Sequence, residues 1–116
     1  MIRFLVPTIL TFAAMTAAAQ ADDLYYIDGY RNNCRLEVGG EGIIAVAPGR
    51  LSITESHYER LTDRQAVAGG WQRATWACMA EGKDCGRAQI DLRITRAWID
   101  VRFSDGKGFT GARCPT

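Results

Sequence analysis

The stretch Trp71–Cys114 decides the fold of this chain, and it reads WQRATWACMAEGKDCGRAQIDLRITRAWIDVRFSDGKGFTGARC. Gly, Asp, Ser and Lys gather at two points and mark turns there, and the chain is predicted to reverse at a third point between two alternating runs. The turns fall at Glu81–Asp84, Thr95-Arg96 and Ser104–Gly108. The runs between them are Trp71–Ala80, Cys85–Ile94, Ala97–Phe103 and a last short run ending in Arg113-Cys114. We interpret this stretch as an antiparallel meander stapled by disulfides.

The strongest local pattern is the alternation on either side of Thr95-Arg96. Apolar residues occupy every second position from Ala88 to Ile94, and again from Ala97 to Phe103. An even-numbered turn would place both apolar sets on one face, because register decides which face each set takes. Such alternation is typical of half-buried antiparallel strands.

The earlier part of the chain adds shorter extended runs. Leu24–Ile27 and Ile43–Ala47 are predicted strands, each followed by a turn pair. Leu51–Leu61 alternates as a strand does, although Ser52–Glu55 also matches a helix capping box, so strand and helix both stay open. Thr62–Gly70 is predicted as a loop with a helical turn at Gln65–Ala68. The whole pattern predicts an all-β antiparallel domain of six or seven strands, closing as a barrel or a sandwich.

The first residues have the features of a targeting segment. Arg3 is followed by the apolar run Phe4–Ala19, and Ala19-Gln20-Ala21 gives a small-x-small cleavage pattern. We predict a signal peptide over residues 1–21 and a single small β domain over 22–116, periplasmic or secreted after cleavage near Ala21. The alternative is an N-terminal anchor that stays attached, but the run is short for a membrane span, so no stable membrane insertion is expected.

Four cysteines form an even set in a chain predicted to be exported, which indicates disulfides rather than a metal site. Cys78 and Cys85 flank a predicted turn symmetrically, and Cys34 and Cys114 would then tie the two ends of the domain together. The two other connectivities are not excluded by the sequence. With this pairing, loop entropy predicts about 2.5 kcal/mol of stabilisation from the short loop and about 4.5 kcal/mol from the long one.

The charge of the chain bounds its partners. Fourteen basic residues face thirteen acidic ones, and removal of Arg3 with the targeting segment leaves the two signs equal. Nucleic acids and anionic membranes select a clear basic excess, so neither is expected as the main partner. Gly106–Gly111 matches the G-x-G-x-x-G pattern of dinucleotide-binding loops, but Cys114 and Pro115 oppose the helix that must follow, so we interpret it as a hairpin turn and expect no cofactor.

Trp98 is the leading candidate for a binding residue. On the strand interpretation it points away from the core, beside Asp100 and Arg102 and across from Arg93. An exposed tryptophan framed by arginine and aspartate is a common recognition surface. The structural alternative is that Trp98 covers an edge or stacks on Arg93.

Catalytic and metal chemistry have weaker signals. Glu55, His57 and Glu59 would share a strand face, but His57 is the only histidine and tight zinc or copper sites want more nitrogen or sulfur ligands. We therefore expect no metal site, and the lone histidine also weakens Ser/His/Asp catalysis. A carboxylate pair drawn from Glu55, Glu59, Asp91 and Asp100 is the remaining hydrolytic possibility.

Several turn and cysteine residues resemble a loose group of small secreted bacterial proteins without an assigned activity. The matching features are the spacing of Glu55 and Glu59 and the four motifs Gly70-Trp71, Cys78 with Glu81-Gly82, Asp105-Gly106 and Arg113-Cys114. The resemblance covers the last sixty or so residues, about half the chain, and implies a small β domain. This chain has Ser56-His57-Tyr58 where the group suggests a cysteine, and it has Cys85 instead, so no disulfide pairing is carried over.

The sequence thus predicts a non-catalytic exported binding module for an unknown protein, small-molecule or glycan partner. One alternative is an inhibitor of a cell-wall or secreted hydrolase, which would insert Glu81–Asp84 or Ser104–Gly108 into an enzyme cleft. The other is a small carboxylate-dependent hydrolase. A wide apolar groove would favour the binding module, and a protruding rigid loop would favour the inhibitor. Two carboxylates facing each other in a deep cleft would favour the hydrolase.

Overall fold

The computed structural model of the protein describes residues 22–35 and 40–115. The predicted signal peptide at 1–21 lies outside the described residues. Nine strands and one short 3-10 helix make up the described fold. In chain order they are β1 (Asp23–Ile27), η2 (Arg31–Arg35), β2 (Ile43–Ala47), β3 (Arg50–Ile53), β4 (Ser56–Arg60), β5 (Gln65–Val67), β6 (Trp71–Ala80), β7 (Lys83–Ile94), β8 (Trp98–Phe103) and β9 (Gly108–Arg113).

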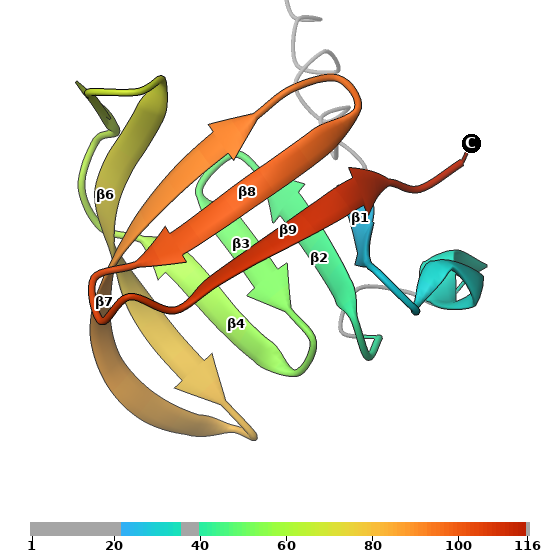
Figure 1. The fold of residues 1–116 in the computed structure, drawn as a ribbon. Helices are drawn as coiled ribbons and strands as arrows, with labels where there is room; N and C mark the ends of the chain where they lie inside the picture. The colour runs from blue at the N-terminus through green and yellow to red at the C-terminus, as the bar shows by residue number, and fades with distance from the viewer. Residues whose placement is uncertain (1–21, 36–39, 116) are drawn as a thin grey trace, which may run out of the picture.

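Eight of these strands form a closed antiparallel barrel, which confirms the all-β prediction and decides for a barrel over a sandwich. The ring runs β4-β3-β2-β1-β9-β8-β7-β6, and β4 pairs with β6 to close it. The first and last strands lie side by side, because Tyr25–Ile27 pairs with Gly111–Arg113 (Figure 1). β5 pairs with the first residues of β6, beyond the end of β4.

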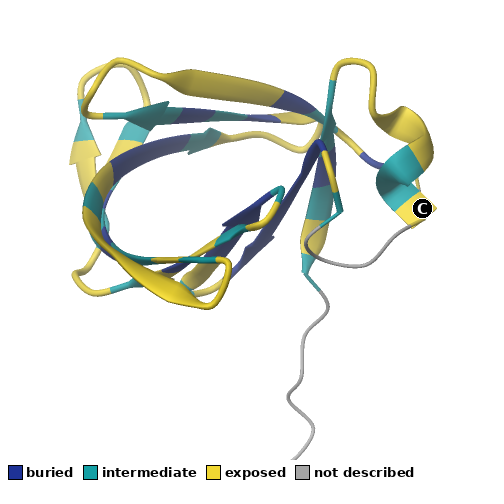
Figure 2. Ribbon diagram, turned by 90° about the horizontal axis from the view of Figure 1, so that it is seen from below, coloured by how far each residue is buried: buried dark blue, intermediate teal, exposed yellow. Residues whose placement is uncertain are grey.

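Alternate side chains of each strand fill the barrel. Eight strands enclose a space that side chains alone can fill. Trp76 and Tyr25 are the largest side chains there, each only 1% exposed. Figure 2 looks into the ring, with buried positions along its walls and η2 outside it. The rest of the core is mainly aliphatic: Ile44, Val46, Leu51, Ile53, Tyr58, Ala74, Ile90, Leu92, Ile99 and Val101.

The hairpin of β7 and β8 confirms the predicted alternation. Ile90, Leu92 and Ile94 pair with Phe103, Val101 and Ile99, so both apolar sets share the inner face of the sheet, although Ile94 at the end of β7 is exposed. The turn lies one residue later than predicted, because β8 begins at Trp98. The amide of Thr95 donates to the carbonyl of Trp98 at 2.8 Å and closes the hairpin.

Leu51–Leu61 is a hairpin, so the prediction of one continuous strand or a helix is wrong. β3 and β4 pair antiparallel across a turn at Thr54-Glu55. Thr54 has φ 54°, a left-handed conformation that β-branched residues rarely adopt. Its hydroxyl accepts a hydrogen bond from the amide of Gly42 at 3.2 Å, which helps to hold the turn in place.

The predicted loop over Thr62–Gly70 also contains a strand. β5 takes the place of the helical turn that was predicted at Gln65–Ala68. Its three residues pair with Trp71–Arg73, and a left-handed pair of glycines, Gly69 and Gly70, makes the turn between them. These two changes raise the count from the predicted six or seven strands to nine.

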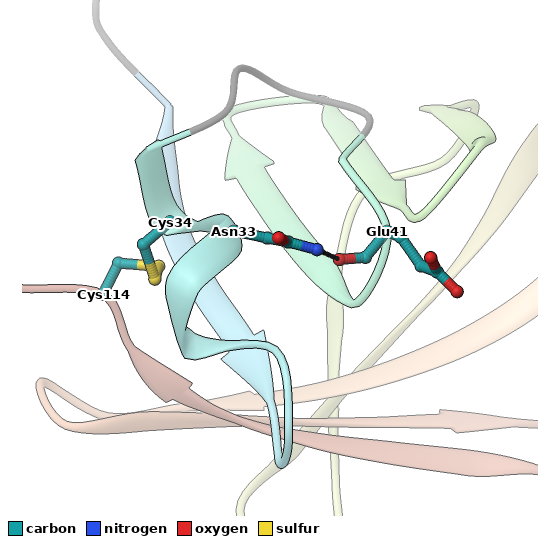
Figure 3. The surroundings of a disulfide bond; sticks show 4 residues. All are labelled: Asn33, Cys34, Glu41 and Cys114. Atoms are coloured by element: carbon teal, nitrogen blue, oxygen red, sulfur yellow. Dashed lines mark hydrogen bonds between the residues drawn. A yellow bond between two sulfur atoms is a disulfide. The ribbon is translucent and has the colours of Figure 1, made fainter.

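One disulfide ties the helical turn to the end of the chain. Cys34 in η2 is bonded to Cys114, which directly follows β9, with the two Cα atoms 5.7 Å apart. Close by, the side-chain amide of Asn33 donates to the carbonyl of Glu41 at 2.8 Å (Figure 3). This predicted pairing is confirmed, and it connects residues that are 80 positions apart.

The other disulfide staples the hairpin of β6 and β7. Cys78 is bonded to Cys85, as predicted, with Cα atoms 5.0 Å apart. The two residues are not directly opposite, because Cys78 pairs with Gly86 and Met79 with Asp84, which leaves Cys85 as the extra residue of a bulge. Gly86 has φ 91° there, and its amide donates to the Asp84 side chain at 2.7 Å.

Two disulfides indicate an oxidising compartment, because cytosolic thiols are kept reduced. Within the described part of the chain, no helix has the length and apolar character needed to cross a membrane.

Candidate functional site

The outer face of β6, β7 and β8 carries the predicted binding residues, and we call it the arginine–tryptophan surface. It comprises Trp71, Arg73, Asp91, Arg93, Trp98, Asp100 and Arg102. These side chains point outward because their neighbours Ala74, Ile90, Leu92, Ile99 and Val101 fill the interior. In the sheet, Arg73 pairs with Asp91 and Asp91 with Arg102, while Arg93 pairs with Asp100.

Asp91 is the centre of this surface, and two arginines hold it. Nε of Arg73 lies 2.9 Å from Oδ1 of Asp91, and Nη2 of Arg102 lies 2.8 Å from Oδ2. Asp91 is only 4% exposed, although it faces outward, because the guanidinium groups cover it. Hydrogen bonds from Arg73 and then Arg102 lower the pKa of Asp91 and outweigh the opposite effect of its burial.

Asp100 is also held by hydrogen bonds, from Arg93 and from Thr110. Nη2 of Arg93 donates to Oδ2 of Asp100 at 2.9 Å, and the hydroxyl of Thr110 donates to Oδ1 at 2.8 Å. Arg93 also donates through Nη1 to the carbonyl of Gly69 at 3.0 Å. Basic and acidic groups therefore alternate across the strands, so each charge has an opposite neighbour.

Trp71 lies against two of the arginines. The guanidinium carbons of Arg93 and Arg102 are 4.3 and 4.1 Å from the centre of its ring, within range of a cation–π interaction. Trp71 and Trp76 are five positions apart and so lie on opposite faces of β6, and it is Trp76 that fills the core. The sequence did not predict the contacts of Trp71 with the arginines, because these contacts depend on how β6 lies against β7 and β8.

Trp98 stands at the edge of this surface. It is 36% exposed, and the guanidinium carbon of Arg93 is 5.9 Å from its ring centre. A shallow hollow of about 320 Å³ lies beside the ring, lined by Asp100, Thr110, Gly111 and Ala112. The structure thus brings Trp98, Arg93, Asp100 and Arg102 onto one surface, the arrangement expected from the sequence.

A second hollow of about 380 Å³ adjoins the first. Both hollows are lined by Asp100 and Thr110. The remaining residues of the second hollow come from the strands and from the turn between β8 and β9: Trp71, Arg93, Val101, Arg102, Gly106, Lys107, Gly108 and Phe109. The sequence did not single out Lys107, which joins this surface only because the turn folds back beside Arg102.

A different groove lies on the outer face of β2, β3, β4 and β6. It encloses about 350 Å³ and has a largely apolar lining, which includes Ala45, Ala77 and Met79. Ser52 and His57 are directly opposite each other in this groove. The hydroxyl of Ser52 is buried without a hydrogen-bond partner among the described residues, so it is not activated by His57.

The remaining acidic candidates are dispersed. Glu55 lies in the turn between β3 and β4, and Glu59 is on the outer face of β4, away from Asp91 and Asp100. Within residues 22–35 and 40–115, no three His, Cys, Asp or Glu side chains are grouped closely enough to hold a metal ion. Hydrogen bonds from two arginines lower the pKa of Asp91, which opposes a role as general acid, and Asp100 is bonded to Arg93 and Thr110.

Comparison with protein-family models, with curated proteins and with solved structures finds no match to this chain. The resemblance to small secreted bacterial proteins therefore stays a hypothesis. The geometry of the arginine–tryptophan surface is the basis for assigning a function.

Proposed function

We propose that the protein is an exported, non-catalytic binding module whose ligand docks on the arginine–tryptophan surface. The observation that carries this proposal is the exposed ring of Trp98 beside arginines that are already fixed by carboxylates and by Trp71. Tryptophan and arginine dominate the energetics of protein binding surfaces. The apolar ring and the polar groups beside it would together hold a ligand in one orientation.

The ordering of the arginines supports binding because it reduces the entropy that is lost when a ligand docks. A free arginine side chain loses substantial rotamer freedom when it is immobilised. Arg93 has three hydrogen bonds through Nε, Nη1 and Nη2, to Asp100 and Gly69. Arg102 uses Nε and Nη2 for Asp91, which leaves Nη1 for a ligand.

Export to the periplasm or the medium is the second part of the proposal. The predicted signal peptide with its cleavage pattern at Ala19-Gln20-Ala21 supports it, and so do the two disulfides. The mass of the protein purified from the producing cells tests it, because cleavage after Ala21 gives a chain that begins at Asp22.

Trp98→Ala tests the binding surface. We expect this variant to fold as the wild type does and to lose at least about tenfold in affinity for any ligand found on a glycan or peptide array. Met79→Ala is the matched control, because Met79 is also exposed but lies in the groove with His57. Equal affinity of Trp98→Ala and wild type would place binding elsewhere on the barrel.

Inhibition of a secreted hydrolase is a second candidate, favoured by the tip of the β6–β7 hairpin. Residues 81–87 are all exposed, and the Cys78–Cys85 disulfide holds the tip rigid. Figure 1 shows this hairpin reaching beyond the strands on either side of it. Rigid loops of this kind enter enzyme clefts at low entropic cost. Loss of lysozyme or protease inhibition on Lys83→Ala, but not on Trp98→Ala, would favour this function.

A further inference from the structure

We infer that the arginine–tryptophan surface binds an acidic oligosaccharide, a chain of sugars that carry carboxylates. This inference rests on the proposed binding function and adds the chemical class of the ligand. Three observations carry it: the local charge, the unused donors and the shape of the two hollows.

The larger hollow has a positive charge, although the chain as a whole is almost neutral. Its charged lining residues are Arg93, Arg102 and Lys107 on the basic side and Asp100 on the acidic side, an excess of two positive charges. Asp91 lies behind this lining and is balanced by Arg73. Such a hollow attracts an anionic group and repels a cationic one.

Hydrogen-bond donors remain for that anion. Lys107 takes part in no ion pair among the described residues. Asp105, in the same turn, accepts a hydrogen bond from the backbone amide of Lys107 at 2.9 Å instead. Nη1 of Arg102 also has no partner in the described structure, since Asp91 is bonded through Nε and Nη2. A lysine ammonium and a guanidinium edge that share one hollow are a suitable pair for a carboxylate.

The smaller hollow is suited to a sugar ring. Its lining is largely apolar and combines Trp98 with the small residues Gly111 and Ala112. Trp98 is paired with Ala112 on the neighbouring strand. The flat face of a pyranose packs against an aromatic ring, while its hydroxyls need polar groups at the edge. Asp100 and Thr110 supply those groups, and they also line the larger hollow.

Because the two hollows share Asp100 and Thr110, one ligand that carries both a sugar ring and a carboxylate could occupy them together. A carboxylated sugar chain would place a ring against Trp98 and a carboxylate near Lys107. An acidic peptide could supply the carboxylate, but its flexible side chains offer no rigid ring face for the Trp98 hollow. We therefore favour the saccharide, and the peptide is an outcome that the experiment separates.

The test is calorimetric titration of the disulfide-bonded protein with trigalacturonate, with neutral maltotriose and with hexaglutamate. We expect trigalacturonate to bind at least about tenfold more tightly than either of the others. Its affinity should fall as sodium chloride is raised from 50 to 300 mM, because part of the attraction is between exposed charges.

Two variants locate the site. Lys107→Ala should lower the affinity for trigalacturonate roughly twofold to fivefold, the usual effect of removing one exposed charge. Lys83→Ala is its matched control, since Lys83 is the other lysine of the mature chain and lies at the tip of the β6–β7 hairpin. Trp98→Ala should weaken binding about tenfold or more, because it removes the ring that contacts the sugar.

Three results would overturn the inference. They are maltotriose binding as tightly as trigalacturonate, hexaglutamate binding more tightly, and no saccharide binding at all. In the first two cases, a loss of affinity in Trp98→Ala would still show that the ligand binds on this surface. Only the assignment of an acidic oligosaccharide as the ligand would then be wrong. Equal affinity of Lys107→Ala and Lys83→Ala for trigalacturonate would likewise place the carboxylate outside the larger hollow.

Discussion

Ser52 shows how a single side chain can conflict with its surroundings. It is only 5% exposed, and its hydroxyl has no hydrogen-bond partner among the described residues. Burying a hydroxyl without a partner costs free energy that alanine would not incur. We predict that Ser52→Ala raises the free energy of unfolding by about 1 kcal/mol, measured by urea denaturation. A loss of stability would mean that the hydroxyl is bonded in solution.

Asp91 makes the stability of the arginine–tryptophan surface dependent on pH. Its folded pKa is lowered, mainly by the hydrogen bond from Arg73, so the folded state binds its proton less readily than the unfolded state does. The stabilisation is therefore complete above the unfolded value of about 3.9 and is lost as the pH falls through the folded pKa. We predict that this contribution to the free energy of unfolding falls progressively below about pH 4, measured by urea denaturation as a function of pH.

Asp91→Asn isolates this contribution. The variant should lose about 1–3 kcal/mol at pH 7, because Arg73 and Arg102 keep only weaker hydrogen bonds there. The difference from wild type should shrink as the pH falls through the lowered pKa of Asp91, since the wild-type carboxyl then becomes protonated too. Asp105→Asn, in an exposed turn, is the control. A difference that stays constant with pH would show that Asp91 does not titrate as described.

The outward-facing residues were largely predictable, because side chains alternate between the two faces of a strand. Trp98, Asp100 and Arg102 followed from the buried positions Ile99 and Val101. The contacts of Trp71 with two arginines were not predictable. They require the lateral position of β6 relative to β7 and β8, which comes from pairings far apart in the sequence. Lys107 was missed for a different reason, because only the pairing of Arg102 with Gly108 brings the turn between β8 and β9 back beside Arg102.

Among the elements, the β6–β7 hairpin depends on a bulge that only a few residue types allow. Gly86 sits there at φ 91°, and a Cβ on it would meet no atom within 4 Å. The whole cost of a side chain is therefore backbone strain. We predict that Gly86→Ala lowers the free energy of unfolding by about 1–2 kcal/mol, measured by thermal or urea unfolding.

Gly86→Asn is the informative companion to that variant, because asparagine accepts left-handed conformations more readily than alanine does. It should lose less stability than Gly86→Ala. Equal losses for both variants would point to a steric cause that the open surroundings of Gly86 do not suggest.

Strand bounds were predictable where turn residues punctuate the sequence. β6 was predicted over Trp71–Ala80 and β2 over Ile43–Ala47, and both are confirmed. The hairpin of β3 and β4 was missed because its turn contains Thr54-Glu55, without the glycine, proline or asparagine that usually marks one. β5 was missed because three residues are too few to show a period.

At the scale of the whole molecule, the pairing of the first and last strands joins the two halves of the barrel. β1 joins β9 by only three residue pairs, Tyr25–Ile27 with Gly111–Arg113. Gly111 allows that approach, since a Cβ there would lie 3.1 Å from Cβ of Tyr25 and 3.2 Å from Cδ1 of Ile44. The Cys34–Cys114 disulfide reinforces this seam, because it joins η2, just after β1, to the residue after β9.

The two disulfides should therefore contribute unequally to stability. Loop entropy predicts a loss of about 4.5 kcal/mol when Cys34 and Cys114 are both replaced by serine, against about 2.5 kcal/mol for Cys78 and Cys85. The first value is comparable to the whole stability of a small domain, so the first variant should be partly unfolded at 37 °C. Urea unfolding and amide hydrogen exchange measure both effects. Exchange should accelerate throughout the barrel in the first variant and only near residues 81–87 in the second. The opposite ranking would mean that the short pairing of β1 with β9 holds the barrel closed without its disulfide.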